Sequence, residues 1–171
     1  SMGFKAFVNL AGYDYYFGKD EYEKGHGTND FDGAWGIWDE NFFQFFADKL
    51  NTFPQPFHST LFSVSSHSPF KLPEKYRDVF KGGSMPIYKL IQFTDYSLKE
   101  FFRKASTMPW YKNTLFVITA DHSSALINYD KYRTASGYFS IPIIFYSPSS
   151  QEKGMDYNIA QQIDIMPTIL S

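Results

Sequence analysis

An aspartate and a histidine, Asp121 and His122, lie shortly after a run of apolar residues at positions 115–118. Carboxylate oxygens and neutral imidazole nitrogens are both good ligands for Mn²⁺, Zn²⁺ or Mg²⁺. The run is rich in β-branched and aromatic residues, which predicts a strand buried on both faces in the middle of a parallel sheet. Ligands of open α/β sheets bind outside the carboxyl ends of strands, so the pair lies where a site is expected. The alternative is a solvated polar turn, because two adjacent ligands make half a metal site at most.

A second polar cluster, Ser65-Ser66-His67, follows a predicted strand over residues 57–64. A right-handed crossover between the strands at 57–64 and 115–118 would make them parallel, with both carboxyl ends at one edge. His67, Asp121 and His122 would then converge on one cleft. This convergence favours a functional site, although His67 taken alone is equally compatible with a plain loop histidine.

The remaining sequence predicts the elements that must position these residues. Helices are expected over residues 40–50 and 86–106, and a third strand over 141–146. Residues 158–170 are expected to form a closing helix or helical turns, interrupted by Pro167. Asp39 is a plausible N-cap for the first helix, and Pro142 places the third strand at a strand start or a sheet edge. The order of elements predicts an α/β sandwich, a mostly parallel sheet flanked by helices.

The composition limits the class of protein. The chain has 171 residues, enough for one domain over residues 3–171, and Ser1-Met2 resembles a tag remnant. Aromatic residues make up 20%, so ring packing must dominate the core. The net charge of −2 without a basic block argues against nucleic acid as a partner. The absence of cysteine excludes disulfides, thiolate metal sites and a cysteine nucleophile.

Several short motifs occur in the order typical of the sulfatase and alkaline phosphatase superfamily. They lie at residues 113–122, 141–148 and 162–170. Upstream segments at 12–14, 35–39 and 66–70 are similar to the lipoteichoic acid synthase and phosphoglycerol transferase branch. No motif is long, but their order and spacing span most of the chain. The chain therefore resembles the C-terminal part of such a protein, and the resemblance implies a partial alkaline-phosphatase-like fold.

The resemblance also implies roles for the three residues named above. In the family an Asp-His pair supplies two ligands of a catalytic divalent ion, which implies that role for Asp121 and His122. Mn²⁺ is the first expectation, with Mg²⁺, Zn²⁺ or Ca²⁺ as alternatives. The histidine of a His-x-Pro-Phe segment helps to hold the substrate phosphate, and that role falls on His67.

The other active-site residues of the family are a threonine nucleophile, a metal-binding glutamate and a Trp/Arg substrate contact. In the family they precede the counterpart of residues 12–14, so we expect this chain to lack them and to be inactive alone. Thr28, Thr60 and Thr119 do not have the nucleophile's sequence context.

The resemblance implies that the parent protein is an enzyme, a metal-dependent phosphoglycerol transferase working through a threonine-linked intermediate. Its partners would be a lipid head-group phosphodiester or sulfate-ester substrate and the missing N-terminal half of the catalytic domain. We expect the parent at the extracytoplasmic face of a bacterial plasma membrane, attached through upstream segments, and the fragment itself to be soluble.

Three alternatives remain open. A sulfatase would hydrolyse sulfate esters, and a phosphoethanolamine transferase would use another lipid donor. The residues upstream of this segment would distinguish both from a phosphoglycerol transferase. A non-catalytic, aromatic-rich binding domain would contain the Asp-His turn for structural reasons alone. That last alternative predicts that the three side chains lie far apart.

Overall fold

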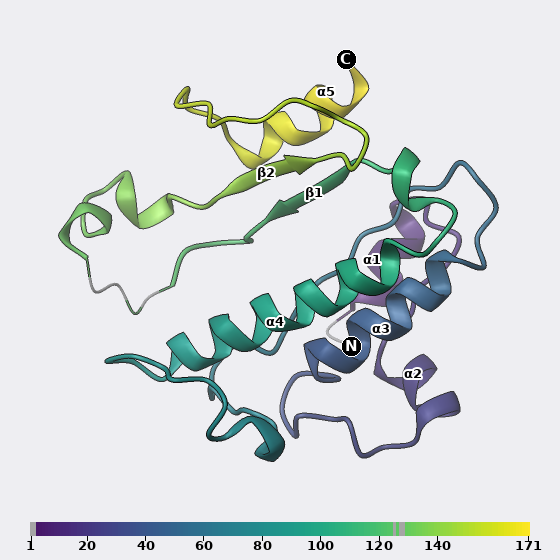
Figure 1. The fold of residues 1–171 in the computed structure, drawn as a ribbon, viewed down its shortest axis with the longest axis horizontal. Helices are drawn as coiled ribbons and strands as arrows, with labels where there is room; N and C mark the ends of the chain where they lie inside the picture. Colours follow the sequence, from purple (N-terminus) through teal and green to yellow (C-terminus); the bar gives the residue numbers. More distant parts are fainter. Residues whose placement is uncertain (1–2, 125, 127–128) are drawn as a thin grey trace. The chain divides into compact units, whose positions relative to one another are not determined.

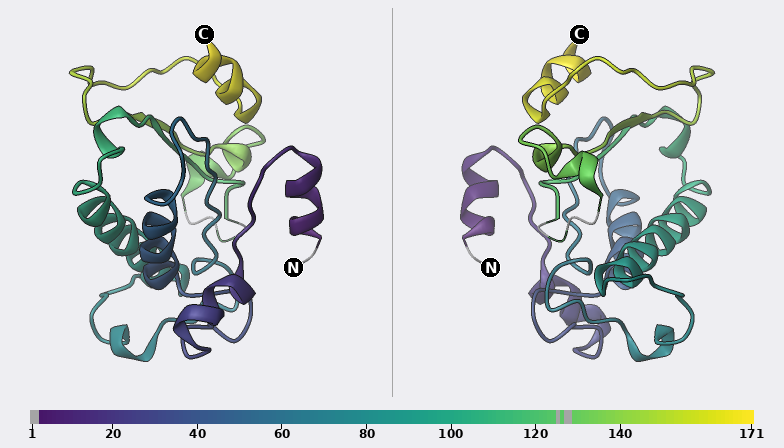
Figure 2. Two further views of the ribbon diagram at one scale, coloured as in Figure 1. Left: turned by 90° about the vertical axis from the view of Figure 1, so that its right-hand side faces the viewer. Right: turned by 90° about the vertical axis from the view of Figure 1, so that its left-hand side faces the viewer.

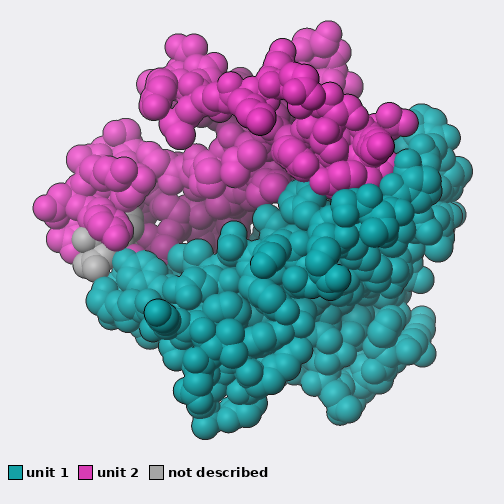
Figure 3. All heavy atoms as spheres, in the orientation of Figure 1, with its two compact units in different colours: residues 1–109 teal, residues 110–171 magenta. Residues whose placement is uncertain are grey.

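The computed structural model describes residues 3–124, 126 and 129–171, which form two compact units (Figures 1 and 3). The first unit runs up to Pro109, and the second begins at Trp110. Ser1-Met2, expected to be a tag remnant, lies outside the described residues. The single domain over residues 3–171 stays a prediction.

The first unit is helical. Its α-helices are α1 (Phe4–Leu10), α2 (Lys19–His26), α3 (Asp39–Leu50) and α4 (Ile87–Ala105), and a short 3₁₀ helix, η1, covers Glu74–Tyr76. The predicted helices over 40–50 and 86–106 are confirmed as α3 and α4. Among the described residues, no helix is both long and apolar enough to cross a bilayer.

Helices α3 and α4 pack against each other and carry the core of this unit (Figure 2). The fully buried residues of α4 recur at helical spacing, because one apolar stripe faces its neighbour. They include Leu90, Phe93, Phe101 and Ala105, each at most 4% exposed. Aromatic rings fill the contact, as the composition predicted: Phe101 meets Phe43 of α3 edge to face, with ring centroids 6.4 Å apart.

Helix α2 lies in a part of the sequence for which no helix was predicted. One residue of this helix, Tyr22, is buried, so an apolar period is missing. Charge supports the helix instead, because Asp20 and Glu21 lie in its first turn and Lys24 and His26 in its last. The Glu21 carboxylate also accepts a hydrogen bond of 2.8 Å from the backbone N–H of Gly18.

Asp39 is the first residue of α3 and its side chain is buried; Trp38 occupies the N-cap position, so the N-cap role predicted for Asp39 is wrong. The carboxylate accepts hydrogen bonds from the backbone N–H groups of Val64 (3.0 Å) and Ser65 (3.2 Å) and from the Thr94 hydroxyl (2.9 Å). The Asp39 N–H donates to the Ser65 hydroxyl at 2.9 Å. One side chain, 1% exposed, therefore joins α3, α4 and the segment just before His67.

The second unit holds a two-stranded sheet of β1 (Phe116–Thr119) and β2 (Ile143–Tyr146). Both strands were predicted, and Pro142 directly precedes β2 as expected. The strands pair antiparallel, with Phe116 opposite Tyr146 and Thr119 opposite Ile143. The α/β class is confirmed, but the mostly parallel sheet is not: this antiparallel pair is the sheet found in the described part of the chain.

Two strand predictions are corrected. Residues 57–64 form no strand pairing and run as irregular backbone. Strand β1 is not buried on both faces, because its first three residues are half-buried and Thr119 is exposed. An apolar, β-branched run specifies extended backbone, but its burial depends on which chains cover it.

The chain ends in short helical pieces. Two 3₁₀ helices lie between the strands, η3 (Asp130–Tyr132) and η4 (Gly137–Phe139), and another, η2 (Tyr111–Asn113), precedes β1. The helix predicted over 158–170 is shorter: η5 (Gln162–Asp164) leads into α5 (Ile165–Leu170). Pro167 lies in the first turn of α5, where a missing N–H costs nothing, so it does not interrupt the helix.

Candidate metal-binding pair and phosphate-binding histidine

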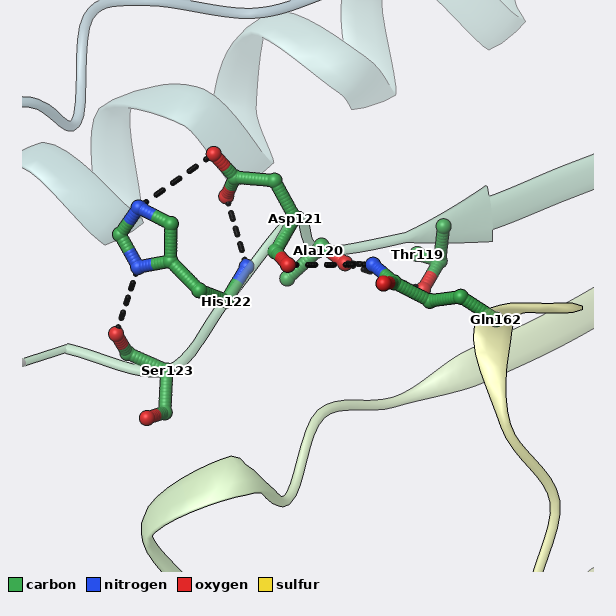
Figure 4. Close-up of polar contacts among 6 residues, drawn as sticks. All are labelled: Thr119, Ala120, Asp121, His122, Ser123 and Gln162. Carbon is green, nitrogen blue, oxygen red and sulfur yellow. Dashed lines mark hydrogen bonds and ion pairs between the residues drawn. The ribbon is translucent and has the colours of Figure 1, made fainter.

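Asp121 and His122 follow β1 after one intervening residue, Ala120, and their side chains lie next to each other (Figure 4). The Asp121 Oδ1 accepts a hydrogen bond of 2.9 Å from the backbone N–H of His122. The other carboxylate oxygen, Oδ2, lies 3.4 Å from Nε2 of the His122 ring. The backbone contact thus holds the carboxylate beside the imidazole, and both side chains remain exposed, by 53% and 71%.

The proton positions on His122 follow from its other contact. Its Nδ1 lies 2.7 Å from the carbonyl oxygen of Ser123. A carbonyl oxygen only accepts hydrogen bonds, so Nδ1 carries the hydrogen, and in the neutral ring Nε2 carries the lone pair. A backbone carbonyl on the second ring nitrogen is the usual outer-shell support of a metal-binding histidine.

The pair fits a divalent cation. Two ligand atoms that each lie about 2.1 Å from one ion at a tetrahedral angle are about 3.4 Å apart, and Nε2 and Oδ2 have that separation. The donor set, one imidazole and one carboxylate, suits Mn²⁺ or Zn²⁺. The residues described here contain no group of three or more His, Cys, Asp or Glu side chains close enough to share an ion.

Gln162 fixes the backbone that carries the pair. Its side-chain amide donates to the carbonyl oxygens of Ala120 (2.8 Å) and Asp121 (3.1 Å), so η5 is tied to the exit of β1 (Figure 4). The Thr119 hydroxyl donates to the Pro142 carbonyl at 2.9 Å, which joins the end of β1 to the start of β2. The sequence predicts no role for Gln162, since a single glutamine in a helical segment carries no signal of such a contact.

His67 lies in a tight turn of the first unit. Its backbone N–H donates to the Val64 carbonyl at 3.1 Å, and its carbonyl accepts from the Phe70 N–H at 3.0 Å. The ring Nδ1 lies 2.8 Å from the Ser68 carbonyl oxygen, so Nδ1 again carries the hydrogen. His67 and His122 therefore share one local arrangement, in which Nδ1 binds the next residue's carbonyl.

Trp35 contacts the His67 turn. The indole N–H donates to the same Ser68 carbonyl at 2.6 Å, and the rings of Trp35 and His67 have centroids 4.1 Å apart. This contact was not predicted, because residues 35 and 67 are distant in sequence and have no shared pattern.

The three predicted site residues are divided between the two units. Asp121 and His122 are brought together in the second unit, and His67 lies in the first. The predicted convergence of His67 with the Asp-His pair stays a prediction, as do the assigned roles of all three residues.

Comparisons with known proteins show the family of this chain. A model of the sulfatase family matches residues 1–171. The lipoteichoic acid synthase-like protein YvgJ of Bacillus subtilis (strain 168) is 26% identical over 93% of this chain and 28% of its own length. Lipoteichoic acid synthase of Staphylococcus aureus (strain USA300) is 25% identical over 99% of this chain and 30% of its own length.

A solved structure is also similar. A protein in the alkaline phosphatase superfamily from Vibrio parahaemolyticus has 29% sequence identity and a TM-score of 0.71, over 89% of this chain and 36% of that chain. The chain thus spans less than two fifths of each of these proteins. The family model spans the whole chain and the solved structure shares its fold, so the chain belongs to the sulfatase family of the alkaline phosphatase superfamily.

Proposed function

We propose that this chain forms part of a metal-dependent phosphoglycerol transferase, in which Asp121 and His122 bind the catalytic divalent ion. The observation that carries the proposal is the 3.4 Å separation of Asp121 Oδ2 and His122 Nε2, with Nδ1 of the histidine bound to a carbonyl. Similarity to lipoteichoic acid synthases supports phosphoglycerol transfer as the reaction class.

Within this proposal the chain's residues have separate tasks. A bound divalent ion supplies Lewis acidity, which lowers the pKa of a nucleophile and neutralises phosphoryl charge. Asp121 contributes negative charge and one oxygen ligand, and Ser123 keeps His122 in the tautomer that leaves Nε2 as a ligand. Gln162 holds the carbonyl groups of residues 120 and 121, so the ligands keep their places.

His67 is proposed to donate a hydrogen bond to a non-bridging phosphate oxygen, which stabilises charge in the transition state. The nucleophile is assigned to none of Thr28, Thr60 and Thr119. The Thr119 hydroxyl already donates a hydrogen bond to the Pro142 carbonyl, which agrees with this. In the proposed mechanism the nucleophile attacks phosphorus, the lipid alcohol leaves, and an acceptor hydroxyl or water later takes the phosphoglycerol group.

The proposed substrate is the phosphodiester head group of a membrane lipid, and the proposed metal is Mn²⁺. A membrane lipid donor would require the parent enzyme to work at a bacterial membrane surface, on its extracytoplasmic side. The family model carries the description "Sulfatase", which favours sulfate-ester hydrolysis as the second candidate. Parallel assays of the full-length protein with a phosphatidylglycerol donor and an aryl sulfate separate the two activities.

The metal proposal can be tested on this chain without an activity assay. Mn²⁺ is paramagnetic and broadens NMR signals near its binding site. Titration of ¹⁵N-labelled protein with Mn²⁺ is expected to broaden the signals of Asp121, His122 and Ser123 before those elsewhere. His122→Ala should abolish this selectivity, because it leaves one carboxylate as the protein ligand.

His58→Ala is the matched control, since it removes an exposed histidine whose ring lies tilted beside that of Tyr13, with centroids 5.4 Å apart. This variant should broaden like the wild type. Uniform broadening in the wild type, or unchanged selectivity in His122→Ala, would remove the Asp-His pair from the proposed metal site.

A further inference from the structure

We propose that Trp35 is a positioning residue for His67: it binds the Ser68 carbonyl, which in turn orients the imidazole so that Nε2 is available to the substrate phosphate. The phosphate part rests on the function proposed above. The positioning part rests on contacts within the first unit.

Trp35 is itself held firmly. It lies in a tight hairpin in which the Asp32 Oδ1 accepts hydrogen bonds from the backbone N–H groups of Ala34 (2.7 Å), Trp35 (2.8 Å) and Gly36 (3.1 Å). The Asp32 N–H donates to the Gly36 carbonyl at 2.9 Å, which closes the loop. The Trp35 backbone is therefore fixed, although its side chain is 44% exposed.

The Ser68 carbonyl accepts two hydrogen bonds. The indole N–H of Trp35 approaches to 2.6 Å and His67 Nδ1 to 2.8 Å. A carbonyl oxygen has two lone pairs, so it can accept both donors. The tilted contact of the rings, 4.1 Å between centroids, further limits rotation of the imidazole. An indole thus fixes the carbonyl, and the carbonyl fixes the tautomer.

Residues 64–68, which contain His67, are also anchored at their other end, again by residues 35–39. Asp39 accepts from the N–H groups of Val64 and Ser65, three and two residues before His67. Between the anchors the chains approach closely, because a Cβ at Gly36 would lie 3.2 Å from Cγ2 of Val64. Residues 35–39 therefore hold residues 64–68 at both ends, a stronger restraint than a solitary loop contact.

The arrangement suits an anion. With Nδ1–H held by Ser68, Nε2 is the ring nitrogen left for a ligand, and the described residues offer it no hydrogen bond. When the ring takes up a proton from solvent, Nε2–H becomes a charge-assisted donor for a phosphate oxygen. The Nδ1 contact is kept in both protonation states, so binding requires no rotation of the ring.

Histidine tautomers can be measured by long-range ¹H–¹⁵N NMR at alkaline pH, where the two ring nitrogens differ according to which one carries hydrogen. We expect His67 of the wild type to be in the Nδ1–H form. Trp35→Phe keeps a ring beside His67 but lacks the indole N–H, so it should shift His67 toward the Nε2–H form that free histidine prefers. Trp38→Phe, the same change three residues away, should leave the tautomer unchanged.

Inorganic phosphate, added where the ring is protonated, then tests the positioning of the ring. Nε2–H is a donor in both proteins, but the Trp35–Ser68 contact holds the imidazole in place in the wild type alone. Phosphate should therefore perturb the His67 ring signals of the wild type and bind roughly five-fold more weakly to Trp35→Phe, as loss of one hydrogen bond's contribution predicts. An unchanged His67 tautomer in Trp35→Phe would overturn the positioning role. A shifted tautomer with no phosphate effect at His67 in the wild type would leave that role intact and contradict the phosphate assignment instead.

Discussion

At the level of single residues, polar side chains do two different kinds of work in this protein. Asp121 and His122 are exposed and keep unused ligand positions, whereas Asp39 is buried and uses its carboxylate for three hydrogen bonds. Burial disfavours the charged form and raises the pKa of Asp39, although the hydrogen bonds to Val64, Thr94 and Ser65 act in the opposite direction. A buried, fully bonded carboxylate indicates a structural role, whereas the exposed carboxylate of Asp121, beside a tautomer-fixed imidazole, suits the ligand role proposed for it.

The raised pKa of Asp39 predicts how stability depends on pH. The folded protein binds the Asp39 proton more tightly than the unfolded chain does, so this group's contribution to the free energy of unfolding falls as pH rises from its ordinary pKa, 3.8, through the folded pKa. Asp39→Asn does not titrate and keeps an oxygen acceptor. Its stability relative to the wild type should therefore increase between pH 3 and pH 7, as measured by urea denaturation.

Asp39→Ala provides the comparison that tests the hydrogen bonds. It removes the acceptor from two buried backbone N–H groups and from Thr94, which should cost about 3 kcal/mol of unfolding free energy. If Asp39→Asn and Asp39→Ala lose the same stability at every pH, the carboxylate is not bonded as described.

At the level of elements, α4 organises the first unit. The pattern of its apolar residues was visible in the sequence, and the structure buries that stripe against α3 and the rings around it. Phe93 is fully buried and meets Trp38, Tyr76 and Phe80 through ring contacts of 5.4 to 6.2 Å. Since Trp38 precedes α3 and Tyr76 lies in η1, one side chain joins three segments.

Phe93→Ala should destabilise the protein by about 4 kcal/mol, because it removes the transfer free energy of a buried ring and leaves a cavity among rigid neighbours. Thermal or denaturant unfolding followed by circular dichroism measures the change. Ile91→Ala, two residues away on the same helix and 50% exposed, should change stability far less. Equal losses in the two variants would contradict the packing.

At the level of the whole molecule, the chain matches less than a third of the length of the lipoteichoic acid synthases compared above. Large apolar side chains also remain exposed, among them Ile159 at 97% and Leu10 at 88%. The proposed site has two metal ligands in the second unit, and catalytic metal sites commonly use at least three protein ligands.

We therefore expect the chain alone to bind Mn²⁺ weakly, with a dissociation constant of roughly millimolar order, and to turn over no phosphodiester. Isothermal titration calorimetry with Mn²⁺ and a chromogenic phosphodiester assay check the two expectations. Micromolar affinity would mean that further ligands lie within this chain, and turnover would mean that a nucleophile does.

The sequence by itself determined the features that depend on local pattern: helices α3 and α4, the extended runs that became β1 and β2, and the polar turn after β1 that holds Asp121 and His122. Helical and strand periodicity and the chemistry of side chains are properties of neighbouring residues, so they can be read along the chain. The sulfatase family, too, was evident from short motifs in order.

Only the tertiary structure decided which distant residues meet. The antiparallel pairing of β1 with β2, the irregular path of residues 57–64, the burial of Asp39 and the contact of Trp35 with the His67 turn all depend on long-range neighbours. Burial and hydrogen-bond partners come from segments far apart in the chain, so no local pattern specifies them. The backbone groups of one extended or polar run can form their hydrogen bonds equally well in several surroundings.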